Sequence, residues 1–352
     1  MEYRDLHNWL VPEANASGTF HFSQLNTGLI GITSGNAMAS FLLAAVDNAN
    51  ATFRSLRRWE MLGNTWIAHF GDTWKITPKL SINYGIRWDR ATPSVEKDDH
   101  LSFLDPYGAN PSAGGRAGRL AFAGDRWGAA SFGRRHPEIT FNKAFAPRLG
   151  IAYSLSPKTV VRTGYGIFYT QAFYPGWGGG SALDGFDANV SYSSTLGGIQ
   201  PAFILNQGFP QNFTPPPFID SGYRNGQNLT YRPFDANRLS YTQQWNLTVE
   251  HEFTSNFYIS AAYVANKGTR LPSSTAPLNA LDPKLLSMGS RLFDEFRPGD
   301  TAVNGVPLPY AGWVEQMTGC APSVAQALLP YPQYCSSLLG LNENAGNSSY
   351  HS

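Results

Sequence analysis

The sequence predicts an all-β protein, an antiparallel transmembrane β-barrel segment of about eight strands with long extracellular loops. Three observations predict this fold class. Charged residues form only 14% of the 352 residues and aromatic residues another 14%, which favours β structure or a surface that meets lipid. Three pairs of alternating segments are each joined by a very short turn. Much longer connections, rich in Gly, Pro, Asn and Ser, separate one pair from the next.

The first predicted hairpin runs from Thr65 to Asp89 and turns at Thr77-Pro78-Lys79. Its second strand alternates almost strictly between apolar and polar or small residues, which is the pattern of a strand with two different faces. The apolar positions are Leu80, Ile82, Tyr84, Ile86 and Trp88. In the first strand Trp66, Phe70 and Trp74 share a face, and Asp72 breaks the pattern.

Two further hairpins repeat this design. The second has Leu149, Ile151, Tyr153 and Leu155 on one face, turns at residues 156–158 and returns through residues 161–169. The third runs from residue 244 to residue 263 and turns at residues 254–256. Each strand is about ten residues long, the length that a tilted strand needs to cross a bilayer. The apolar faces end in Trp or Tyr, as an aromatic girdle at the membrane interface requires.

The connections predict the orientation of these strands. Residues 91–144 and 171–239 are too long and too irregular for a compact soluble domain. Short turns on one side and long loops on the other are typical of bacterial outer-membrane barrels, with the short turns in the periplasm. Two weaker strands are expected upstream, at Glu2–His7 and Gly18–Gln24, and the last strand should end near Ala265.

We divide the chain at residue 268. Residues 1–268 carry the predicted strands, and residues 269–352 form an extracellular-loop-like segment. We expect no strand in that second segment, but short helices are possible around Asp282–Met288 and Pro322–Leu329.

Composition argues against several function classes. The net charge is +1 without a basic run, so nucleic-acid binding has no electrostatic support. No apolar run approaches the roughly 18 residues of a transmembrane helix. The histidines do not cluster, and no nucleophile elbow, phosphate-binding loop or EF-hand spacing occurs. We therefore expect no enzyme activity, no cofactor and no metal site.

Four charged residues on the polar faces are candidates for function: Arg87, Arg148, Arg162 and Glu250. A charge facing lipid at mid-bilayer would cost roughly 2–4 kcal/mol, so these side chains should face the barrel lumen. The arginines could form salt bridges with Asp89, Glu250 or Glu252 across the wall. Alternatively, they could contact a plug or a substrate.

Two other features leave alternatives open. Cys320 and Cys335 lie in a Pro-rich segment, where an oxidising compartment would favour a disulfide, although two free thiols are equally compatible with the spacing. The aromatic residues Tyr169, Phe173, Tyr174 and Trp177 could bind a glycan or a peptide, or simply pack among the outer loops.

Several motifs in order resemble the barrel of TonB-dependent transporters, most closely the Oar-like group. Residues 64–88 are similar to the family's "aDtWkvtp.LtlnyGlRw" hairpin, and residues 146–153 to its "faPRlGfAY". Residues 159–169 and 262–271 are similar to "tvvRgGYGiFY" and "aYvGskGthL". The resemblance implies a partial TonB-dependent receptor β-barrel in the outer membrane of a Gram-negative bacterium, which would move an unknown substrate across that membrane.

The resemblance also implies partners. These are outer-membrane lipid, a plug, the remaining barrel strands and, through the plug, the TonB system. No plug, TonB box or signal peptide is visible in the sequence, so we expect a chain that begins and ends inside the barrel and is inactive alone. The competing hypothesis is a secreted, soluble β-rich protein that binds carbohydrate or has a structural role.

Overall fold

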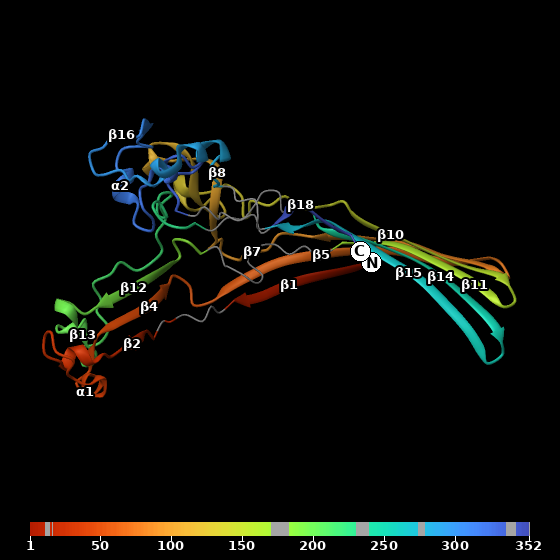
Figure 1. Cartoon of the computed structure of the whole chain (residues 1–352), viewed down its shortest axis with the longest axis horizontal. Coiled ribbons are helices and arrows are strands. Elements are labelled where there is room, and N and C mark those ends of the chain that lie inside the picture. Colours follow the sequence, from red (N-terminus) through yellow and green to blue (C-terminus); the bar gives the residue numbers. More distant parts are fainter. Residues whose placement is uncertain are drawn as a thin grey trace.

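The computed structural model describes residues 1–10, 15, 17–169, 183–229, 239–273, 279–335 and 343–351. Within these residues the largest sheet has nine strands, all paired antiparallel, in the order β1-β5-β6-β10-β11-β14-β15-β18, with β7 beside β5. We call this sheet the wall. It is a curved, open sheet and does not close into a barrel (Figure 1). No helix in the described part is long and apolar enough to cross a membrane.

The wall contains the three predicted hairpins, which are β5–β6, β10–β11 and β14–β15. Its strands are β1 (Glu2–Leu10), β5 (Trp59–Thr77), β6 (Leu80–Ala91), β7 (Val95–Glu96), β10 (Ala144–Ser156), β11 (Thr159–Tyr169), β14 (Tyr241–Thr254), β15 (Phe257–Ser273) and β18 (Glu343–His351). The hairpin tips lie together at one end of the sheet, and the elements of the long connections lie at the other (Figure 1). This is the asymmetry that the turn and loop lengths predict.

Pairing keeps the two faces of the wall chemically distinct. Ile82 is paired with Trp74 on one side and Ile151 on the other, so the apolar positions form continuous rows across the strands. The next residue, Asn83, is paired with Thr73 and Gly150 in a polar row. A slip of one residue would exchange the two faces, so the alternation fixes this register.

The exposure of the side chains changes along the long strand β5. Its first nine residues alternate between buried and less buried positions, whereas every residue from His69 to Thr77 is exposed. Phe70 and Trp74 lie in that exposed part, with 63% and 58% of their surface accessible. Large apolar side chains exposed in a continuous band are what a lipid-facing surface requires.

Two expectations about strands were wrong, and a third was only partly right. The segment Gly18–Gln24 contains only the three-residue strand β2, which pairs with β4 away from the wall. The last hairpin strand, β15, continues past Ala265 and ends at Ser273. Strands also occur after residue 268, where none was expected, and β18 pairs with the outer part of β15.

The long connections are more structured than their sequence indicates. They form an outer layer of short elements, which we call the cap. It contains α1 (Ala37–Leu42), α2 (Trp313–Gln316), α3 (Val324–Ala327), β2 (Thr19–His21), β3 (Ala45–Val46), β4 (Asn48–Arg54), β8 (Ser102–Asn110), β9 (Arg116–Phe122), β12 (Asp187–Ser193), β13 (Phe203–Ile204), β16 (Ala302–Val303), β17 (Val306–Pro307) and 3-10 turns such as Pro283–Phe293. The turn Pro283–Phe293 and α3 overlap the two predicted helices.

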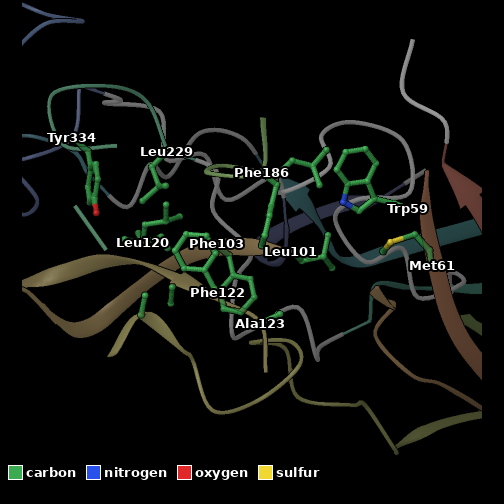
Figure 2. Packing of buried hydrophobic residues seen from close by; sticks show 14 residues of the cluster. Trp59, Met61, Leu101, Phe103, Leu120, Phe122, Ala123, Phe186, Leu229 and Tyr334 are labelled. Atoms are coloured by element: carbon green, nitrogen blue, oxygen red, sulfur yellow. The ribbon is translucent and has the colours of Figure 1, made fainter. Parts of the chain in front are cut away.

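A buried apolar core holds several connections of the cap together (Figure 2). Trp59 and Met61 reach it from the outer end of β5, and Phe103 and Phe122 come from the β8–β9 hairpin. Phe186, Leu229 and Tyr334 belong to connections that are far away in sequence. Burial of these large side chains therefore joins the β8–β9 hairpin to segments of later connections.

A second core lies within the last connection. Trp313 is fully buried there and packs edge-on against Phe296, with ring centroids 5.5 Å apart. Ala113 reaches this core from the β8–β9 connection. Cys320 and Cys335 form a disulfide at the edge of the same cluster.

Candidate functional site

The polar face of the wall carries the four charged candidates. Arg87 and Asp89 are two residues apart on β6 and therefore point to the same face. The Arg87 guanidinium donates two hydrogen bonds to the Asp89 carboxylate, Nε to Oδ2 at 2.8 Å and Nη2 to Oδ1 at 2.9 Å. This bidentate geometry holds the Arg87 side chain along the strand.

Arg162 and Glu250 form a second pair on neighbouring strands. Val160 of β11 is directly opposite Glu250 of β14, so Arg162 approaches the carboxylate diagonally on the same face. Its Nη2 lies 3.3 Å from Glu250 Oε2. Both side chains are partly exposed, so the pair contributes little stability and chiefly balances charge.

Arg148 has a different environment. Within the described residues it pairs with no carboxylate, and its guanidinium carbon lies 4.8 Å from the centroid of the Phe168 ring. Its neighbours across the strands are Gly85 and Gly166, and Ala146 and Gly150 flank it on β10. Arg148 is therefore surrounded by residues with little or no side chain.

Two of these glycines are approached closely by neighbouring groups. A Cβ at Gly166 would come 2.9 Å from the Phe168 ring, and a Cβ at Gly85 would come 2.8 Å from the carbonyl oxygen of Phe70. Larger residues there would displace the ring that supports Arg148 or disturb the β5–β6 pairing. Glycine at these two positions therefore preserves the position of the Phe168 ring and the β5–β6 pairing.

A hollow of about 280 Å³ lies on this face, just inside the cap. Its lining brings together three arginines, Arg4 of β1, Arg87 of β6 and Arg148 of β10, with Asp89 among them. A second hollow of about 640 Å³ shares Arg87 and Arg148 and extends toward Asn83. Arg4 was not among the candidates identified from the sequence. The residues of β1 do not alternate regularly between apolar and polar, so the sequence does not show that Arg4 shares a face with Arg87.

The outer end of the wall has a buried charge, at Glu96 of β7. This residue is only 2% exposed, and its Oε2 accepts hydrogen bonds from the backbone N–H groups of Asp98 and His100 at 2.8 and 2.9 Å. His100 Nδ1 lies 3.4 Å from the same oxygen. Burial opposes ionisation of Glu96, but these donors outweigh it and lower the pKa of the carboxyl group.

Of the aromatic candidates only Tyr169 is described. It lies at the outer end of β11 in contact with Tyr241 and Phe141, whose ring centroids are 5.5 and 6.1 Å away. Phe173, Tyr174 and Trp177 lie outside the described residues. The suggested glycan or peptide site on this loop therefore stays a prediction. The residues that the structure describes contain no group of three or more potential metal ligands.

An antiparallel wall with an apolar exposed face, two-residue turns at one end and a folded cap at the other defines an outer-membrane β-barrel protein. The comparison with protein families agrees with this class. The chain belongs to the family described as outer membrane beta barrel domain, which matches residues 1–352. No curated protein and no solved structure matches the chain.

Family membership decides between the two sequence hypotheses on location. The chain is a protein of the Gram-negative outer membrane, so the secreted, soluble alternative is excluded. The Oar-like, TonB-dependent identity is a finer assignment than the family provides.

Proposed function

We propose that this chain forms part of the wall and cap of a TonB-dependent transporter of the Oar-like type. In this proposal the apolar face contacts lipid and the polar face lines the lumen. The cap faces the outside of the cell and first meets the substrate. A plug, supplied by another part of the same polypeptide or by a separate one, fills the lumen and couples to TonB.

The observation that carries the proposal is the polar face. Its central rows contain Gly71, Gly85, Gly150, Gly164 and Gly166 between the ion-paired arginines. A lumen filled only with water does not require so many small residues, whereas a plug packed against the wall does. The motif series from residue 64 to residue 271 supports the same assignment.

Nothing in this arrangement requires catalysis. The polar face offers paired charges, amides and glycines, which bind and guide a solute without making or breaking covalent bonds. We therefore propose transport without an enzymatic step and without a resident cofactor.

Photo-crosslinking in cells tests the proposal. A photoreactive amino acid at Asn246, on the polar face of β14, should capture a protein segment with the features of a plug. At the adjacent Leu247, on the apolar face, the same group should capture lipid. The protein crosslinks at position 246 should change in cells that lack TonB. Capture of lipid at both positions, or crosslinks indifferent to TonB, would reject the proposal.

A further inference from the structure

The arginine hollow on the polar face has an unbalanced charge. Arg4, Arg87 and Arg148 line it, and the carboxylates close to them are Asp89, paired with Arg87, and Glu2, paired with Arg4. Three guanidinium groups against two carboxylates leave one positive charge, and Arg148 is the arginine without a carboxylate partner in the described residues.

The way Arg148 is held leaves its donors free. One face of the guanidinium is stacked over Phe168, and no described acceptor receives a hydrogen bond from its N–H groups. A guanidinium held by its face still presents its N–H edge in a planar fork that matches a carboxylate or a phosphate. The glycines beside it leave this edge open to the hollow.

From these contacts we infer that the hollow is an oxyanion-binding site in which Arg148 is the primary ligand and Arg4 and Arg87 supply supporting positive charge. The bound group is a carboxylate or a phosphate. It can belong to a solute that passes along the lumen or to an acidic side chain of the plug. This inference rests on the proposed function, because it takes the polar face as the lumen.

The position of the hollow fits a selecting role. It lies where the buried part of β5 ends and the exposed part begins, so an anion that has passed the cap reaches it first. The ion pairs of Arg87 and Arg4 are intact around it, so binding requires no pair to break.

Chemical modification of arginines measures occupancy of this site. Full-length chain in detergent is treated with phenylglyoxal, and the rate at each arginine is followed by mass spectrometry. For a site with millimolar affinity we expect 10 mM inorganic phosphate, or succinate, to slow modification of Arg148 by about threefold or more. Arg162, paired with Glu250 on the same face, is the internal control and should not change.

A matched pair of variants tests the supporting charge. Arg4→Gln should weaken the phosphate protection of Arg148, since it removes a cation that lines the hollow. Lys75→Gln removes a cation from the same face near the turn, away from the lining residues, and should leave the protection unchanged. Equal protection in both variants would overturn the inference.

The same reaction on outer membranes from producing cells separates the two sources of the anion. Slow modification of Arg148 without added anion indicates an acidic group of the plug. Fast modification that phosphate suppresses indicates a solute site. If Arg148 reacts fast in membranes and in detergent, and added anions protect it no more than Arg162, the inference is wrong. The crosslinking result at Asn246 is independent of this outcome.

Discussion

At the scale of single residues, alternation separates two chemical roles along each strand. Leu149 and Ile151 point to one face of β10, and Arg148 and Gly150 to the other. The sequence pattern was enough to group Arg87 and Arg148 on one face. It could not show that Arg148 stacks on Phe168, because that contact depends on how β10 and β11 are paired.

The buried carboxylate of Glu96, at the outer end of the wall, gives a prediction about pH. The folded-state pKa of Glu96 is lowered from its ordinary value of 4.5, so its stabilising contribution is present above that pH. The contribution is lost as the pH falls through the lowered folded-state pKa. The protection factors of the amides of Asp98 and His100, which bond to Glu96, should therefore fall on acidification, after correction for the slower intrinsic exchange at low pH.

The variant Glu96→Gln should reproduce that loosening at neutral pH, at a cost of about 1–3 kcal/mol in local stability. The protection factors in this variant should depend less on pH than those of the unmodified chain. Glu315→Gln is a suitable control, because Glu315 is exposed and lies on α2, the helix that places Trp313 in the other core. Equal effects of both variants would contradict the role assigned to Glu96.

At the scale of elements, the hairpins of the wall were predictable from short stretches of sequence. Their strands alternate between apolar and polar residues, and their turns contain turn-forming residues. The turns occupy Pro78–Lys79, Pro157–Lys158 and Ser255–Asn256, within the predicted triplets. The cap elements leave weak signals, since strands such as β3 and β13 have only two residues each. Their pairing partners are distant in sequence, so periodicity cannot reveal them.

Adjacent residues of β14 test which face meets lipid. Leu247 is near the middle of the strand on the apolar face, and Asn246 is on the polar face opposite Gly164. Leu247→Lys should destabilise the folded chain in lipid vesicles by about 2–4 kcal/mol, because it places a charge in hydrocarbon. Asn246→Lys should cost much less. The denaturant midpoint of the folded fraction measures both, and the reverse order would exchange the two faces.

At the scale of the whole molecule, the main core of the cap is built by several connections together. Phe122 is fully buried in its main core, whereas Phe293 is 79% exposed. Phe122→Ala should therefore destabilise this core by about 3–5 kcal/mol and make the segments that build it sensitive to protease. The same change at Phe293 should have little effect. If cleavage in Phe122→Ala were confined to the β8–β9 hairpin, the connections would be independent.

The polarity of the molecule predicts which surfaces are reached from each side of the membrane. Cysteines introduced at Lys79 and Lys158, at the hairpin tips, should react with an impermeant reagent only from the periplasm. A cysteine at Leu196 in the cap should react from outside intact cells, since this residue is 74% exposed. Labelling of Lys79→Cys in intact cells would invert the topology.

The sequence by itself determined the three hairpins of the wall, their two faces and the end of the sheet at which their turns lie (Figure 1). These depend on alternation, turn length and loop length, which are local properties of the chain. Only the tertiary structure decided that the long connections form a cap around Trp59 and Phe122, that β2 lies outside the wall, and that β18 pairs with β15. It also brought Arg4 beside Arg87 and Arg148. The physical reason is that these features arise from contacts between segments that are distant in sequence. Such contacts produce no periodic pattern of apolar residues within either segment.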